Sequence, residues 1–213
     1  MTRTKLITVA LLAVCVLTAL AAANAFAAKK GEIVNKEGKA LVKGKFVGKS
    51  TRTMLWETEA GSKWTCKETS VTGTISTTKG GGETITYTGC ESGGFKCKLG
   101  SETAGTLIMK ATLGLVVKSE KDYWERALEK EVELVCSGIK IKWKGALLLP
   151  VSPEEVLKTE FVFAALGEKG KQTPEIGANH FEVEFVKEGA KFEKADINEA
   201  ELKTTFEEEV KFI

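Results

Sequence analysis

Short stretches in which apolar and polar residues alternate recur along residues 39–145, separated by glycine. Residues 69–77 (TSVTGTIST) and 83–89 (ETITYTG) follow this pattern and are rich in Thr, Val and Ile, which favour strands. The intervening residues 78–82 (TKGGG) are typical of a turn. Because period-two alternation buries one face of a strand and leaves the other in water, the pattern predicts a hairpin over residues 69–89.

A second hairpin is predicted where VELVC (132–136) is followed by IKIKWK (139–144). The two-residue link Ser137-Gly138 favours a tight turn, and the apolar residues of the second stretch share one face while three lysines share the other. Further strands are predicted over residues 62–67, 106–111, 115–118, 159–163, 180–186 and 190–197. Residues 200–213 fit either a strand pair or a helix, of which we favour strand.

Helix-forming residues are concentrated in two short segments. Residues 119–131 (SEKDYWERALEKE) fit either a short surface helix or a charged hairpin loop, and residues 153–157 fit one helical turn capped by Ser152. We therefore predict an all-β protein, an antiparallel sandwich or flattened barrel of roughly ten to twelve strands with at most one or two short helices. The alternative to a single domain is a second lobe over residues 151–213, where the strands carry more Glu and Lys.

The N-terminus has the three parts of a secretory signal peptide. Arg3 and Lys5 precede an uncharged apolar run over residues 6–23, and Ala25-Phe26-Ala27 matches a cleavage site. The run approaches the ~20 residues that span a bilayer, so an uncleaved anchor is the alternative, which the cleavage motif disfavours. The expected mature domain is residues 28–213, secreted or held at the cell surface without stable membrane insertion.

The charge balance narrows the choice of partners. The chain has 31 basic and 29 acidic residues, and removal of Arg3 and Lys5 makes the two numbers equal. A neutral domain has no electrostatic basis for binding nucleic acid or an anionic membrane. The Gly80–Gly82 run is not followed by the Lys-Ser/Thr pair of a phosphate loop, and no cofactor is expected.

Four cysteines remain after the signal peptide is removed: Cys66, Cys90, Cys97 and Cys136. An even number in an exported protein predicts two disulfides, and three pairings are open. We favour a local Cys90–Cys97 clasp with a long Cys66–Cys136 bridge. A metal site is disfavoured, because the chain has no C-x-x-C pair and a single histidine.

Residues 56–66 (WETEAGSKWTC) resemble the L-E-T-x-G-G-S-K-x-T-C run of a group of exported actinobacterial proteins. Residues 88–97 (TGCESGGFKC) are similar to the T-G-C-E-x-x-G-x-x-C run that follows in that group, and later motifs extend the resemblance over residues 45–180. The resemblance implies a secreted, disulfide-bonded β domain of unknown function, and it assigns no functional residues. The sequence departs from the group at Trp56 and Trp64 and in its charged C-terminal third.

Candidate catalytic residues are sparse. A Ser–His–Asp arrangement would have to use His180 with Asp122 or Asp196, and no Gly-x-Ser-x-Gly elbow occurs. Paired glutamates could support a carboxylate-based hydrolase, but glutamates are so numerous that no pair stands out. We predict no catalytic and no metal-binding residues.

The four tryptophans point to two different environments. Trp64 and Trp143 alternate with polar residues and are expected in the core. Trp124 and its neighbour Tyr123 lie in a charged segment and are the candidates for stacking on a sugar ring. The first expectation is a non-enzymatic, secreted structural or interaction module. The alternatives are a module that binds glycan or cell-wall polymer, and a carboxylate-based hydrolase; the expected partner is a cell-wall polymer or a surface protein.

Overall fold

The computed structural model describes residues 31–118, 121–136, 138–152, 155–165, 167–168, 171–172, 182–186 and 193–213. Gly31–Ile213 form one compact unit, and the predicted signal peptide lies outside the described residues. Every regular element in the described residues is a strand, which confirms the all-β prediction. The structure describes eighteen strands rather than ten to twelve, because several strands are only two to five residues long.

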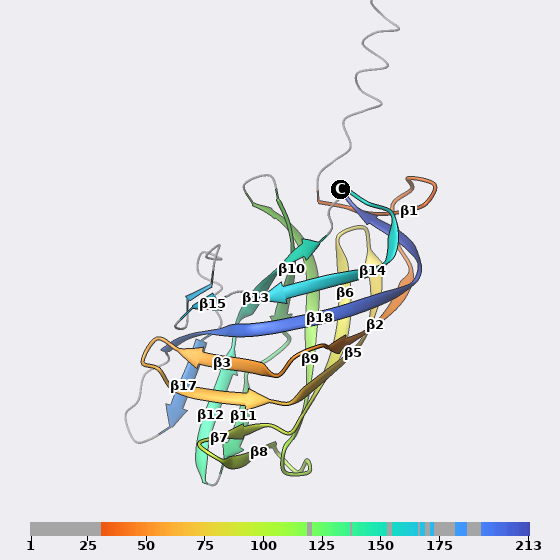
Figure 1. Ribbon diagram of the computed structural model, residues 1–213. Coiled ribbons are helices and arrows are strands. Elements are labelled where there is room, and N and C mark those ends of the chain that lie inside the picture. Colours follow the sequence, from red (N-terminus) through yellow and green to blue (C-terminus); the bar gives the residue numbers. More distant parts are fainter. Residues whose placement is uncertain are drawn as a thin grey trace, which may run out of the picture. The chain divides into compact units, whose positions relative to one another are not determined.

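Eight strands form a closed barrel, shown in Figure 1. Their order is β14 (Lys158–Ala165), β13 (Ala146–Ser152), β10 (Lys121–Leu128), β9 (Thr106–Lys118), β6 (Gly80–Thr88), β5 (Glu68–Thr77), β2 (Gly44–Ser50) and β18 (Glu193–Phe212). Neighbours are antiparallel, and β18 pairs with β14 to close the ring. We call this ring the large barrel; of the two predicted architectures, it fits the barrel rather than the sandwich.

The other strands form a second, smaller ring of pairings that also begins and ends at β18. From β18 the order is β17 (Glu182–Val186), β12 (Ile139–Lys144), β11 (Val132–Cys136), β8 (Phe95–Leu99), β7 (Glu91–Ser92), β4 (Lys63–Cys66) and β3 (Met54–Thr58). Strand β3 pairs back to β18. Outside the two rings, β1 (Ile33–Asn35) pairs with the end of β18, and β15 (Gly167–Glu168) pairs with β16 (Lys171–Gln172).

Both predicted hairpins are confirmed as β5–β6 and β11–β12. The predicted strand over residues 200–213 is also confirmed, but it belongs to the twenty-residue strand β18. Because β14 and β18 complete the large barrel, these strands beyond Pro150 do not form a lobe of their own.

The segment 119–131 does not form a helix where the structure describes it. Residues 121–128 are strand β10, which pairs with β9 on one side and β13 on the other. Two neighbouring strands satisfy its backbone hydrogen bonds, and this overrides the weak helix preference of its residues. Of the second expected turn of helix, residues 153–154 lie outside the described part and residues 155–157 are irregular.

Two clusters of aromatic rings fill the core. The large barrel contains a cluster of rings from different strands: Phe46, Trp124, Phe161, Phe163, Phe206 and Phe212. In the smaller ring, Trp56 stacks on Trp143 with ring centroids 4.8 Å apart and on Trp64 at 5.9 Å. Tyr87 contacts Trp56 edge-on and joins the two clusters into one continuous core, which confirms the predicted burial of Trp64 and Trp143.

The disulfide pairing differs from the one we favoured. The structure joins Cys66 to Cys90 and Cys97 to Cys136. The strand order β4–β7–β8–β11 separates Cys66 from Cys136 by the β7–β8 hairpin, so these two cannot bond. Cys97 and Cys136 face each other directly across β8 and β11. Two disulfides fit an oxidising environment outside the cytosol.

This pairing predicts the fragments of a tryptic digest made without reduction. Cleavage after lysine separates all four cysteines, since Lys96 lies between Cys90 and Cys97. We expect mass spectrometry to detect two disulfide-linked pairs: peptide 64–67 with peptide 80–96, and peptide 97–98 with peptide 131–140. A link between peptides 80–96 and 97–98 would contradict the fold of the smaller ring.

Candidate functional site

A buried ion pair lies inside the large barrel. Arg126 on β10 donates from Nε and Nη2 to the two carboxylate oxygens of Glu83 on β6, the second bond being 3.1 Å long. Both side chains are buried, and the bidentate geometry offsets part of the cost of removing two charges from water. Burial raises the pKa of Glu83, and the positive charge and hydrogen bonds of Arg126 oppose that rise.

The space around this pair is filled. The Thr69 hydroxyl donates to the Met54 sulfur at 2.6 Å, and the Tyr87 ring is fully buried nearby. Beside Arg126 a space of about 10 Å³ remains, which is the size of a single water molecule. The described interior therefore holds its own side chains, and the larger depressions lie on the outer surface.

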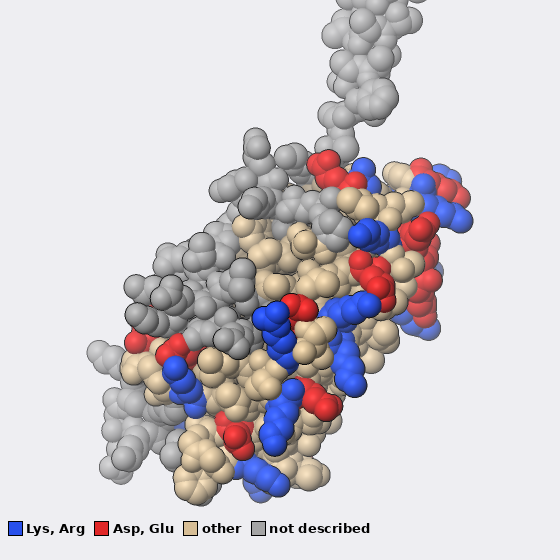
Figure 2. All heavy atoms as spheres, viewed as in Figure 1, with Lys and Arg blue, Asp and Glu red and all other residues tan. Residues whose placement is uncertain are grey.

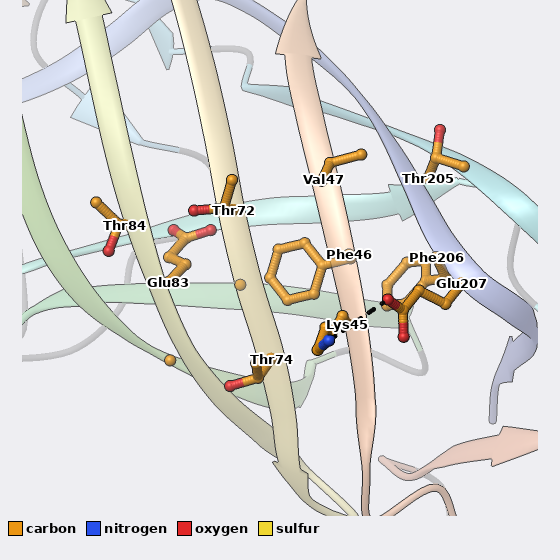
Figure 3. A pocket seen from close by; sticks show the side chains of 12 residues that line it. Lys45, Phe46, Val47, Thr72, Thr74, Glu83, Thr84, Thr205, Phe206 and Glu207 are labelled. Carbon is orange, nitrogen blue, oxygen red and sulfur yellow. Dashed lines mark ion pairs between the residues drawn. The ribbon is translucent and has the colours of Figure 1, made fainter.

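A depression of about 570 Å³ lies on the outer face of the large barrel (Figure 3). We call it the Gly82 groove. Four neighbouring strands, β6, β5, β2 and β18, supply its outward-facing residues: Gly82, Thr84, Thr72, Thr74, Lys45, Val47, Thr205 and Glu207. Pairing places Thr72 between Thr84 and Val47, and Val47 opposite Thr205, so one row of side chains crosses the groove.

Gly82 leaves part of the groove open. A Cβ atom at Gly82 would meet only the Ala111 carbonyl oxygen at 3.8 Å, which is ordinary contact, so the fold leaves room for a larger residue. At the adjacent Gly80 and Gly81 a Cβ would collide with backbone carbonyls, and at Gly73 it would collide with the Phe46 ring, which reaches from β2 toward β5 in Figure 3. The fold requires these three glycines but not Gly82.

The surface of the groove is neutral and mixed in polarity. Four threonines offer hydroxyl and methyl groups, and Val47 is 57 % exposed. Lys45 and Glu207 lie 3.9 Å apart at the rim and balance each other. Glu83 also borders the groove, but its carboxylate is held inside the barrel by Arg126. Figure 2 shows positive and negative side chains interspersed on the face in view.

The candidate glycan-binding residues are not exposed. Trp124 is 2 % exposed and packs against Phe46, Phe163 and Phe212 inside the large barrel, while Tyr123 is 8 % exposed beside Leu148. The prediction of an exposed aromatic pair was wrong, because β10 is a barrel strand whose alternation points Trp124 into the core. His180 lies outside the described residues, as do the side chains of Asp122 and Asp196.

Within the described residues, no group of three or more His, Cys, Asp or Glu side chains is arranged to hold a metal ion. No described segment forms a helix long and apolar enough to cross a membrane.

Comparisons of the chain with protein-family models, with curated proteins and with solved structures found no match. The β-rich architecture and the two disulfides are features of this structure, while the resemblance to exported actinobacterial proteins rests on the sequence motifs alone.

Sequence reasoning missed the Gly82 groove. Gly80–Gly82 read as part of a turn, whereas Gly82 lies within strand β6 and faces outward. The available signal was the alternation itself: it puts Thr72, Thr74 and Thr84 on the polar faces of two adjacent strands, and Gly82 pairs with Thr74.

The buried ion pair predicts an asymmetric mutational response. Glu83→Ala leaves the Arg126 guanidinium buried without its carboxylate and should lower the free energy of unfolding in urea by about 3–5 kcal/mol. Replacing both residues with methionine should recover most of that loss, because no charge is then buried. A loss below about 1 kcal/mol in the single variant would show that the pair is not in the interior.

Burial of Tyr87 predicts a loss of stability in alkali. Burial raises its pKa from 10.0 to about 12; the positive charge of Arg126 opposes this rise, and the negative charge of Glu83 adds a smaller one. The pKa of Tyr87 is higher in the folded protein than in the unfolded chain. Its neutral side chain therefore contributes about 2–3 kcal/mol to the free energy of unfolding; this contribution is complete below about pH 10 and is lost as the pH rises through about 12. Urea unfolding across this range should show the decline, and Tyr87→Phe should make it shallower. Equal slopes in the two proteins would contradict the assignment.

Proposed function

We propose that the protein is a non-enzymatic exported module that binds another macromolecule through the Gly82 groove. Gly82 is the observation that carries the proposal. A glycine inside a strand costs stability, and one of its uses is to let another molecule approach closely. Gly82, unlike Gly73, is not required by the fold, and unlike Gly114 it lies in the groove.

Export is supported by the sequence and by the disulfides. Residues 1–27 have the organisation of a cleavable signal peptide, and all four remaining cysteines are paired. The motifs shared with exported actinobacterial proteins favour the same location. The expected partner is therefore a surface protein or a cell-wall polymer outside the cell.

The chemistry of the groove favours binding over catalysis. Its hydroxyls come from threonines on neighbouring barrel strands, and its acid–base pair, Lys45 and Glu207, lies at the solvent-exposed rim. The aromatic rings nearest the groove, Phe46 and Phe206, are buried beneath it, so a platform for stacking on sugar is not offered there. A protein surface fits such a lining better than a glycan does.

Filling the groove should abolish binding without harming the fold. Gly82→Val places a branched side chain in the open space and suits a strand. In host cells that produce the full chain, we expect the wild-type protein to be retained on the cell surface and the Gly82→Val protein to be released into the medium.

The matched control is Gly114→Val on β9, where a Cβ also meets only ordinary contacts and which lies outside the groove. It should be retained like the wild type. Equal retention of all three proteins, with equal melting temperatures, would refute the groove as the contact surface.

A further inference from the structure

The hairpin β7–β8 carries an exposed aromatic side chain at its tip. Ser92 pairs with Phe95 across Gly93 and Gly94, whose φ angles of 57° and 82° suit a tight two-residue hairpin turn. Phe95 is 54 % exposed, although it belongs to a residue type that normally packs in the core. We call residues 91–96 the Phe95 finger.

Both disulfides brace this finger. Cys90 precedes it and is bonded to Cys66 at the end of β4, while Cys97 follows it and is bonded to Cys136 on β11. The Cys97 amide also donates to the Cys90 carbonyl at 2.9 Å. The tip is thus held in place before any contact is made, so little conformational entropy remains to be lost on binding.

Glu91 lies opposite Lys96 on the finger, so the excess positive charge comes from Lys98 just after it, while exposed carboxylates lie at one rim of the Gly82 groove. Lys96 and Lys98, on the finger and just after it, are both exposed. Glu207, Glu208 and Glu209 form an exposed acidic run along β18, and the first two line a depression that shares Lys45 and Thr74 with the groove. Lys43 and Lys45 line the same depression, and Lys45 is paired with Glu207, so Glu208 and Glu209 are the carboxylates left for an incoming lysine.

The finger cannot reach the groove of its own chain. It belongs to the smaller ring and lies at the lower end of the unit in Figure 1, whereas the groove lies over β2, β5, β6 and β18 of the large barrel. Paired strands and two disulfides hold both features in place. A contact between two molecules would explain both features: the exposure of the Phe95 ring on a rigid tip, and the open groove at Gly82 that the fold does not require.

We propose that the Phe95 finger of one copy inserts into the Gly82 groove of the next. The proposal deepens the proposed function, on which it rests, by naming a second copy of this chain as a partner of that groove. The Phe95 ring would lie over Gly82 between Val47 and the threonine methyls, with Lys96 and Lys98 facing the acidic run on β18. Finger and groove are different surfaces, and we propose that the contact is head-to-tail rather than exchanged reciprocally in a dimer, so that it extends into open chains or rings.

One finger in one groove is a small interface, so the association is weak in dilute solution and effective where molecules are concentrated at a surface. We expect a dissociation constant of about 0.1–1 mM for the oxidised mature protein, measured by sedimentation equilibrium over a range of concentrations. The average mass should rise without reaching a plateau at the dimer, and added salt should weaken the association.

Two variants test the contact from its two sides. Phe95→Asp removes the aromatic ring of the finger, and Gly82→Val fills the groove. For each variant alone, we expect the dissociation constant to rise at least tenfold above that of the wild type, so that the protein is monomeric where the wild type associates. Val156→Asp, at another exposed apolar residue, is the matched control and should associate like the wild type. Circular dichroism and the melting temperature establish that each variant is folded.

The decisive experiment mixes the two variants. Phe95→Asp keeps an intact groove and Gly82→Val keeps an intact finger, so the mixture should form one-to-one dimers that cannot extend. A monomeric mixture, or a wild type that stays monomeric at the highest concentration, would overturn the proposal. If the wild type stays monomeric while Gly82→Val still releases the protein from cells, self-association fails and the proposed function stands.

Discussion

The whole fold depends on one strand that serves two rings. Strand β18 pairs with β17 and β3 near its start and with β14 and β2 further along, so both rings of strands close on it. A sheet edge exposes unpaired backbone groups, and closure removes such edges. Because the two rings share a wall, their aromatic clusters meet in one core, with Tyr87 against Trp56 at the junction.

The two rings are stabilised in different ways. The strands of the large barrel are seven to twenty residues long, so they make many ladder hydrogen bonds around a core of phenylalanine rings. In the smaller ring, the neighbouring strands β3, β4, β7 and β8 are only two to five residues long. Such strands have little pairing of their own, and the two disulfides hold them to each other and to β11. The same bonds that stabilise this ring give the Phe95 finger its rigidity.

The Glu83–Arg126 pair and the Gly82 groove lie on opposite faces of the same strand. Glu83 points into the barrel and Gly82 points out, so the inward residues of β6 serve the fold while the outward ones are available for function. This division follows from the two-residue period of a strand. It explains why the groove could have a neutral, weakly polar lining although the sheet behind it holds a buried charge.

Much of the local structure was predictable from the sequence. Alternation identified the hairpins β5–β6 and β11–β12 and placed Trp64 and Trp143 in the core, because the pattern of one strand reports which of its faces is buried. The cysteine count predicted two disulfides. Strand β10 was not predicted, because its residues favour a helix. Its backbone is satisfied by pairing with β9 and with β13, and β13 lies later in the sequence, beyond Gly145.

Only the tertiary structure decided which strands are neighbours. The order β4–β7–β8–β11 set the disulfide pairing, the closure at β18 turned a predicted sandwich or flattened barrel into two rings, and the inward face of β10 buried Trp124. The Gly82 groove belongs to the same category, because its lining comes from four strands between residues 45 and 207. Alternation is a local property of a chain, whereas strand order depends on long-range pairing. For that reason the sequence by itself determined strands such as β5, β6, β11 and β12 and their buried faces, but not strand β10 and not the site.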